Sequence, residues 1–314
     1  MNDAYIRVEN IVKEYPGVMA LDRVSFIVTK GSIHGFLGPN GAGKSTTLSI
    51  IVGLFPPTSG KVFIKGLQRS QNQKQIGSMI GFLPENPPLY GYMRVRDFLS
   101  FVGRIHNLSK GESLIQADSL IELCGLQVVK SRMINNLSKG FKQRIGIAQT
   151  LVYNPEIIIL DEPSVGLDPN SLMEIRDLIL SLKENHTILL SSHQLGEVDL
   201  LCSDITIINA GKIVASGPKD AIAKDLQGKQ IIDVEVVNWS EDLAREFERE
   251  FDVERLEMKK ETDIFKMKIF LKTNKDLRGE ISGFLVKRNC NLLSIKRMVM
   301  NLEDIFKETV RDKR

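Results

Sequence analysis

The sequence contains few cysteines and no long run of apolar residues. Its 314 residues include three cysteines, Cys124, Cys202 and Cys290, and no two of them have the spacing of metal ligands. This pattern argues against a disulfide framework or a zinc site and favours buried, reduced thiols in a cytosolic protein. Apolar stretches such as 157–160 and 188–190 are far shorter than the roughly 20 residues of a membrane span. The first residues, MNDAYIRVEN, lack the apolar core of a signal peptide. We therefore expect a chain with neither a signal peptide nor a transmembrane segment.

The sequence also has no large excess of either positive or negative charge. The chain has 42 basic and 39 acidic residues, a formal net charge of +3. Neither a basic block nor a basic amphipathic helix stands out, so we expect no nucleic-acid partner. If this protein acts at a membrane, we expect a separate chain to supply the membrane-spanning subunit. The length suits one large domain and a smaller one.

Short β-rich runs and helical patterns alternate through the first 220 residues. Apolar residues recur at the helical period over 95–105, and further helices are expected at 113–124 and 138–152. The strands at 157–160 and 187–191 are wholly apolar, which indicates a parallel sheet buried on both faces.

Composition shifts near Gly217 and Pro218. Beyond Lys229 the predicted order is strand, helix, strand, strand, helix, strand, with a last helix at 302–311. This βαββαβ order indicates a small ferredoxin-like α+β domain at 230–314, after a domain at 1–225.

A glycine-rich loop at 38–45 reads GPNGAGKS and fits G-x-x-x-x-G-K-[ST]. It follows an apolar strand and precedes a helix, so its backbone N–H groups and the positive helix end can surround phosphate oxygens. Lys44 should reach the β- and γ-phosphates, and Ser45 should ligate Mg²⁺. The alternative, a chance glycine-rich turn, explains neither flanking element.

The apolar strand at 157–160 ends in two acids, Asp161 and Glu162. In a phosphate-loop protein, a carboxylate at this place binds Mg²⁺ directly or through water. Glu162 is placed to orient and polarise the attacking water. Without the loop, two solvated acids at a strand end would explain the pattern equally well.

The order of motifs resembles the nucleotide-binding subunit of an ATP-binding-cassette (ABC) transporter over residues 1 to about 220. The signature motif is matched by 137–144 (LSKGFKQR), the D-loop by 164–168 (SVGLD), and the switch-histidine segment by 191–193 (SSH). Tyr15 stands where the family stacks an aromatic ring on adenine, although a plain surface tyrosine fits too. His193 could also be an ordinary histidine at a strand end, without the switch role.

The resemblance implies an α/β P-loop NTPase cassette: a parallel-sheet core, an antiparallel β subdomain, and a helical subdomain at about 86–155. It also implies an active site shared by two subunits, a homodimer or a heterodimer. ATP on the loop of one subunit is capped by Ser138 and Gly140 of the other, and Asp168 couples the two sites. His193 contacts the γ-phosphate and holds Glu162 and water in register.

These expectations define the candidate residues. The catalytic set is Lys44, Glu162 and His193. The nucleotide-binding set is Tyr15, Gly38, Pro39, Asn40, Gly41, Ala42, Gly43, Lys44, Ser45, Thr46, Ser138, Gly140 and Asp168. The Mg²⁺ set is Ser45, Asp161 and Glu85.

Three positions depart from the family pattern. Lys139 and Phe141 stand where the signature motif usually has glycine and glutamine. Because Ser138 and Gly140 are retained, we expect activity to survive, and Lys139 adds positive charge near the nucleotide. Glu85 replaces the Q-loop glutamine; it can accept a bond from a metal-bound water but cannot donate as an amide does.

The motif variants look like the export branch that works with separate six-helix permeases, which includes gliding-motility, multidrug, sodium and polysaccharide exporters. We therefore expect an ATPase on the cytoplasmic face of the membrane, bound peripherally to a permease. The alternative is a soluble cassette ATPase of translation or DNA maintenance. Such proteins usually carry two cassettes or a long coiled-coil insertion, and this chain has neither. For 230–314 the resemblance suggests a regulatory or dimer-supporting role.

Overall fold

The computed structural model describes residues 4–226, 230–273 and 275–298. Contacts divide the chain into two compact units, Met1–Lys219 and Asp220–Arg314. Each unit is described by itself. The predicted helix at 302–311 lies outside the described residues. Within these ranges, no helix has the length and apolar character needed to cross a membrane.

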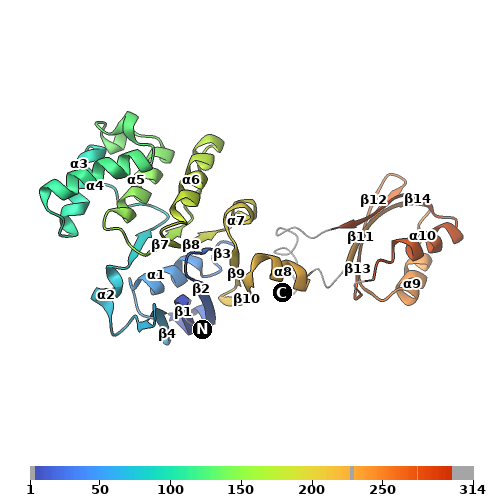
Figure 1. Ribbon diagram of the computed structural model, residues 1–314. Helices are drawn as coiled ribbons and strands as arrows, with labels where there is room; N and C mark the ends of the chain where they lie inside the picture. The colour runs from blue at the N-terminus through green and yellow to red at the C-terminus, as the bar shows by residue number, and fades with distance from the viewer. Residues whose placement is uncertain (1–3, 227–229, 274, 299–314) are drawn as a thin grey trace. The chain divides into compact units, whose positions relative to one another are not determined.

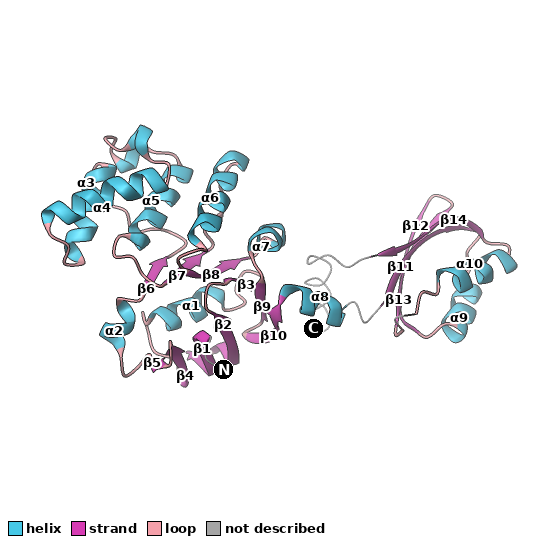
Figure 2. Cartoon of the chain, viewed as in Figure 1, coloured by secondary structure: helices cyan, strands magenta, loops and turns pink. Residues whose placement is uncertain are grey.

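The first unit contains two sheets and a group of helices (Figures 1 and 2). Its strands are β1 (Ala4–Tyr15), β2 (Val18–Thr29), β3 (Ile33–Leu37), β4 (Ser59–Ile64), β5 (Leu67–Gln68), β6 (Ile80–Leu83), β7 (Ile157–Asp161), β8 (Thr187–Ser192), β9 (Asp204–Asn209) and β10 (Lys212–Pro218). Its helices are α1 (Lys44–Val52), α2 (Gln73–Gly77), α3 (Val95–Ile105), α4 (Lys110–Leu123), α5 (Lys139–Leu151), α6 (Pro169–Leu182) and α7 (Leu195–Leu201), with short 3₁₀ turns at Gln127–Val129 and Ile134–Asn136.

The larger sheet has the order β10-β9-β3-β8-β7-β6. It is parallel from β9 to β6, and only the edge strand β10 runs antiparallel to its neighbour. Every residue of β3, β7 and β8 is buried, as expected for parallel strands covered on both faces. The carboxyl ends of these strands therefore meet at one edge, where loops can build a site.

The smaller sheet, β2-β1-β4-β5, is antiparallel. Its inward side chains, such as Ile6, Val8 and Phe26, join α1 and the large sheet in one core. The sequence patterns did not predict β9 and β10.

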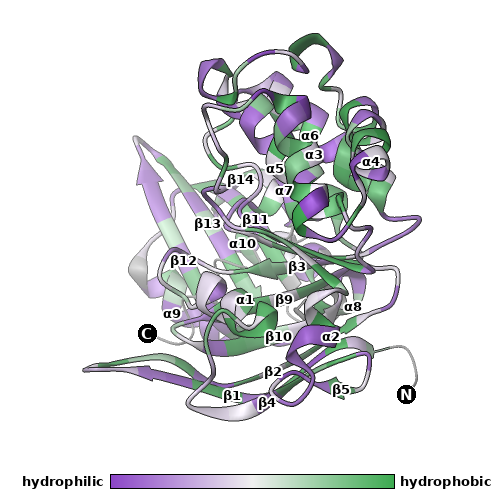
Figure 3. Ribbon diagram, turned by 90° about the vertical axis from the view of Figure 1, so that its left-hand side faces the viewer, coloured by the Kyte–Doolittle hydropathy of each residue, from purple (hydrophilic) through white to green (hydrophobic). Residues whose placement is uncertain are grey.

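Helices α3, α4 and α5 form a separate group in the first unit (Figure 1). Polar and apolar bands alternate along α3 and α4 (Figure 3), because only one face of these two helices is buried. Helix α5 is buried over most of its surface. In α3 the buried residues include Val95, Phe98, Leu99 and Val102. Helix α4 begins earlier than predicted, at Lys110, because Ser109 and Glu112 form a capping box.

The second unit has helix α8 (Lys219–Leu226) at its start and then a four-stranded antiparallel sheet, β12-β13-β11-β14. The strands are β11 (Gln230–Val237), β12 (Val253–Glu261), β13 (Ile264–Leu271) and β14 (Asn291–Met298). Helices α9 (Glu241–Glu250) and α10 (Arg278–Lys287) lie on one side of this sheet (Figure 2). Its core includes Ile232, Val234, Phe247, Ile269 and Phe284.

Candidate functional site

The glycine-rich loop joins β3 to α1. Gly43 takes the N-cap position with φ +107°, in the left-handed region, and a Cβ there would lie 2.9 Å from the Ala20 carbonyl oxygen. Only glycine accepts this backbone without strain. Because Gly43 has no side chain to cap the helix, the first N–H groups of α1 are left for an anionic ligand.

A cleft of about 520 Å³ lies over this loop. Among its lining residues are nine that the sequence predicted: Asn40, Gly41, Gly43, Lys44, Ser45, Thr46, Glu85, Glu162 and His193. The rest come from the β1–β2 hairpin and two turns: Val18, Met19, Ala20, Val165, Ala210 and Gly211. The predicted residues Gly38, Pro39 and Ala42 do not line the cleft; the carbonyl oxygens of Gly38 and Pro39 accept from Lys44, and Ala42 is buried.

Tyr15 does not line the cleft. Its side chain is exposed, and the Lys13 ammonium lies 5.2 Å from its ring centroid. Its cross-strand neighbour Val18 does line the cleft.

Lys44, Glu162 and His193 form one connected chain in the cleft. The Lys44 ammonium donates to the carbonyl oxygens of Gly38 (2.7 Å) and Pro39 (3.2 Å), and lies 3.1 Å from Glu162 Oε1. Glu162 Oε2 lies 2.8 Å from His193 Nδ1. Lys44 and Glu162 are only 6% and 7% exposed, so each charge depends on its partner.

Ser191 ties the two acids of β7 to β8. Its hydroxyl donates to Asp161 Oδ1 (2.6 Å) and accepts from the Glu162 backbone N–H (2.9 Å). Asp161 and Ser191 are paired in the parallel register, which explains the contact. Glu162 has φ +48°, a costly backbone conformation for a non-glycine residue. The sequence indicated the 191–193 segment but not this role of Ser191.

The three residues predicted to bind Mg²⁺ offer one hydroxyl and two carboxylate groups. Ser45 and Glu85 line the cleft; Asp161 does not, and its Oδ1 accepts from the Ser191 hydroxyl. These hydroxyl and carboxylate oxygens are hard donors of the kind Mg²⁺ prefers, with waters and substrate phosphates completing the shell. No cluster of three or more histidines, cysteines or acids that could hold a metal occurs among the described residues.

Ser138 and Gly140 of the signature motif and Asp168 of the D-loop lie outside the cleft, at the starts of two helices, whereas Val165 of the D-loop lines it. Ser138 caps α5 by accepting from the Phe141 N–H (3.4 Å). Asp168 caps α6 by accepting from the Ser171 N–H (3.0 Å) and hydroxyl (2.7 Å), and the Ser171 backbone N–H lowers the Asp168 pKa. A Cβ on Gly140 would collide with Ser171 Oγ. Gly140 therefore lets the two helix starts approach closely.

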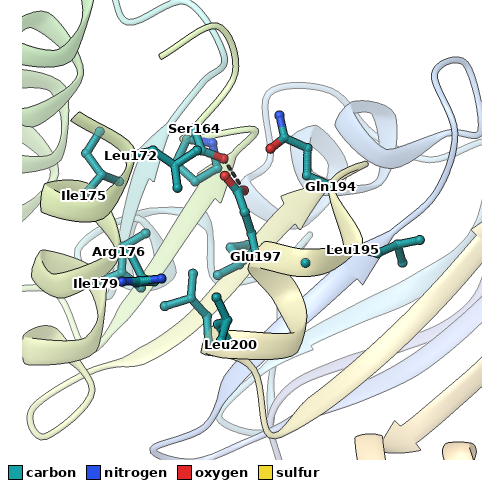
Figure 4. Close-up of a pocket in the computed structure, with 13 residues that line it drawn as sticks. Ser164, Leu172, Ile175, Arg176, Ile179, Gln194, Leu195, Glu197 and Leu200 are labelled. Atoms are coloured by element: carbon teal, nitrogen blue, oxygen red, sulfur yellow. Dashed lines mark hydrogen bonds between the residues drawn. The ribbon is translucent and has the colours of Figure 1, made fainter. Parts of the chain in front are cut away.

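A second hollow, of about 340 Å³, lies between α6 and α7 (Figure 4). Leu172, Ile175 and Ile179 line it from the α6 side, and Glu197 points from α7 toward Ser164. The Ser164 hydroxyl donates to Glu197, whose pKa is raised by burial. This bond joins the segment after Glu162 to the helix after His193, a link that the motifs did not predict.

The fold and the cleft define a P-loop ATPase cassette. A family model described as ABC transporter matches residues 21–165. The bacitracin transport ATP-binding protein BcrA of Bacillus licheniformis is 32% identical over 303 residues, covering 96% of this chain and 95% of that protein. The linearmycin resistance ATP-binding protein LnrL of Bacillus subtilis is 36% identical over 237 residues, covering 75% of this chain and 76% of that protein.

Solved structures of ABC transporter cassettes have a similar fold. An ATP-binding subunit of an ABC transporter has a TM-score of 0.64 and 29% identity, covering 71% of this chain and 93% of that one. The cassette MJ1267, in its ADP conformation, has a TM-score of 0.61 and 28% identity, covering 69% and 92%. The chain belongs to the ABC transporter family, as a nucleotide-binding and ATP-hydrolysing cassette.

Proposed function

We propose that this cassette powers export through a separate integral-membrane permease, bound peripherally at the cytoplasmic face of the membrane. The observation that carries the ATPase mechanism is the Lys44–Glu162–His193 chain beside the phosphate loop. The roles for which two relatives are named, bacitracin transport and linearmycin resistance, support outward transport. They also favour a permease-linked ATPase over a soluble cassette of translation or DNA maintenance.

In this proposal Lys44 has two alternative anionic partners. The backbone carbonyls of the loop keep its ammonium in place, while a phosphate oxygen can replace Glu162 Oε1 as its counter-charge. Glu162 is then available to accept a proton from the attacking water. His193, 37% exposed at the cleft wall, holds Glu162 Oε2 and reaches the γ-phosphate.

The proposed site also includes ligands for Mg²⁺ and an aromatic ring for adenine. Ser45, Asp161 and Glu85 would hold Mg²⁺, whose charge neutralises the phosphate oxygens. Tyr15 would stack on adenine at the edge of the cleft, next to Val18, which already lines it.

The second half of each active site comes from another cassette, in a homodimer or a heterodimer. Ser138 and Gly140 begin α5, whose positive end attracts phosphate, yet they lie outside their own cleft. In the proposed dimer they cap the nucleotide of the partner, and Asp168 couples the two sites through Ser171 and Gly140.

An aromatic cluster on the helical subdomain, at about 86–155, is the proposed permease contact. The rings of Tyr90 and Tyr92 stack with centroids 5.9 Å apart. Tyr92 is 74% exposed, and Phe101 lies beside Tyr90. Exposed apolar side chains that gather in one place mark interaction sites. Leu89 adjoins the cluster. Tyr92→Ser is expected to reduce co-purification with the permease and leave the ATPase rate of the isolated cassette unchanged.

We propose the domain division 1–225 for the cassette and 230–314 for a ferredoxin-like accessory domain. The strand order β14-β11-β13-β12 and the two helices on one face support this assignment. The BcrA alignment covers 96% of the chain, so it includes much of this region. A regulatory or dimer-supporting role is proposed for it. Unchanged ATPase rate, dimerisation and transport after deletion of 230–314 would exclude that role.

The function is tested by reconstituting the chain with its permease in vesicles. We expect ATP-dependent transport, and expect Lys44→Ala to lose ATP affinity because it removes the ammonium that binds phosphate. Ser181→Ala, an exposed hydroxyl on α6, is the matched control. Equal ATP affinity in Lys44→Ala would mean that the loop is not the nucleotide site. Failure to bind any membrane protein would refute the transporter proposal.

A further inference from the structure

The accessory sheet has one face that bears charged rows. Helices α9 and α10 pack against Ile232, Val234 and Ile269 on the other face. Side chains alternate along each strand, so Asp233 and Lys268 point away from that core. Polar and apolar residues alternate in the same way along these strands in Figure 3. No described helix of 230–298 covers this face, which is hollowed by about 440 Å³.

The antiparallel register sets the charged side chains in two rows across the four strands. In order β12, β13, β11, β14, the first row is Glu257, Lys268, Asp233 and Lys296. The second row is Lys259, Lys266, Glu235 and Ser294. The first row therefore reads minus, plus, minus, plus, and the second reads plus, plus, minus, neutral.

A single two-fold rotation places these rows opposite the same rows of a second copy, with complementary charges facing each other. A two-fold axis along the strands, between β13 and β11, places β12 over β14 of a second copy and β13 over β11. Lys268 then faces Asp233 of the second copy, and Glu257 faces Lys296. In the second row Lys266 faces Glu235, and Lys259 faces the neutral Ser294. No like charges meet in either row.

We propose that this face pairs with the same face of a second copy of the chain. This rests on the dimer-supporting role proposed above and names its surface. Opposite charges on neighbouring strands also stabilise a single sheet, so alternation of charge within one row does not by itself indicate a partner. The same axis sets opposite charges face to face in three of the four kinds of contact that the two rows make, and like charges in none.

The sign pattern disfavours other partners. The two rows carry four lysines and three acids, so neither a polyanion such as nucleic acid nor a strongly basic segment meets a uniform surface. Two of the lysines also form ion pairs within their own chain. Glu261 lies 2.8 Å from Lys259 and 2.6 Å from Lys266, and its pKa is lowered to about 2 by these lysines. In the first row Glu257 lies 3.4 Å from Arg255 of its own strand. The contacts between Lys268 and Asp233 thus carry most of the contrast between copies.

The area of this sheet face suits an interface that adds to another contact between the same two chains. Four strands about 4.8 Å apart and two rows of side chains cover only a few hundred Å² per copy, below the roughly 800 Å² per partner of a standard interface. The contact therefore acts between chains that another interface already holds close, where the effective concentration is high.

Charge reversal with mixing tests the pairing. Full-length chains carrying Glu162→Gln are assembled with Mg-ATP, and the dimer dissociation constant is measured by sedimentation. Lys268→Glu and Asp233→Lys should each weaken the dimer roughly tenfold, because symmetry spoils two contacts at once. Mixing the two variants should restore affinity, since the introduced acid of one chain then faces the introduced base of the other. The unchanged Asp233 and Lys268 also face each other in the mixed dimer. Lys287→Glu, an exposed reversal on α10, should have little effect.

Cross-linking tests the orientation independently. Ser294→Cys chains mixed with Lys259→Cys chains should link through a bismaleimide spanning about 10 Å, the separation of packed sheets. Ser294→Cys chains alone should not, because their thiols lie at opposite edges. The native cysteines are buried. The pairing is refuted if neither reversal weakens the dimer, if mixing gives no rescue, or if the mixed thiols do not link. Dimerisation with ATP in those experiments would leave the proposed function standing.

Discussion

Ser191 is the residue whose removal should best separate the positioning of the acids from nucleotide binding. Ser191→Ala deletes a hydroxyl that holds Asp161 Oδ1 at 2.6 Å and the Glu162 N–H at 2.9 Å. Ser191 is fully buried and Asp161 is 4% exposed, so water cannot easily replace the lost partner. An unsatisfied buried donor or acceptor costs about 1–3 kcal/mol, and more if charged. Two such groups give an expected loss of roughly 3 kcal/mol in cassette stability.

The same change should lower kcat more than ATP affinity. Glu162 keeps its φ of +48° partly through the bond to Ser191, and such a backbone costs about 1–3 kcal/mol. Without the bond, Glu162 loses its fixed position while the phosphate loop is untouched. Stability is measured by urea unfolding, and turnover by phosphate release at saturating Mg-ATP. Ser181→Ala is the control for loss of a hydroxyl. Unfolding free energy and kcat both equal to wild type would refute this reasoning.

Two further predictions concern buried titratable groups. Burial lowers the pKa of His34 to about 4; because the unfolded value is higher, the neutral form's contribution is present above about pH 6.5 and is lost as pH falls toward 4. This contribution amounts to roughly 2–3 kcal/mol between about pH 7.5 and about pH 4.5. His34→Gln can still bond Thr206 but does not titrate. The free energy of unfolding in urea should therefore change less over that pH range in the variant, by this amount. An equal pH slope in both proteins would contradict the prediction. Glu197→Ala should cost about 1–2 kcal/mol by leaving the buried Ser164 hydroxyl without its acceptor, whereas Glu197→Gln should retain most of the stability; equal losses in thermal unfolding would exclude the hydrogen bond as the cause.

Local patterns in the sequence predicted much of the cassette fold. The wholly apolar run 157–160 predicted a buried parallel strand because no polar side chain interrupts it, and β7 occupies it. The glycine-rich loop predicted the strand-to-helix junction at 38–45, since few other structures accept that spacing of glycines and lysine. A helix was also predicted at 138–152 from the helical pattern, and α5 occupies Lys139–Leu151 with Ser138 as its N-cap.

Contacts between distant segments could not be predicted in the same way. The bonds from Ser191 to Asp161 and from Ser164 to Glu197 depend on which strands are neighbours and in what register. Strand β10 was missed because its mixed burial gives no clear period. Tyr15 was assigned from a motif position alone, and its side-chain direction depends on the β1–β2 hairpin.

The most direct test of a hydrolytic site shared by two cassettes is the sedimentation of Glu162→Gln with Mg-ATP. If Glu162 accepts the proton of the attacking water, its amide should bind ATP and lower turnover by about 10²–10⁴-fold. The nucleotide should then persist between two chains, and the protein should sediment as a dimer with ATP and as a monomer with ADP. A Glu162→Gln chain that turns over ATP at the wild-type rate, or stays monomeric with ATP bound, would contradict the account.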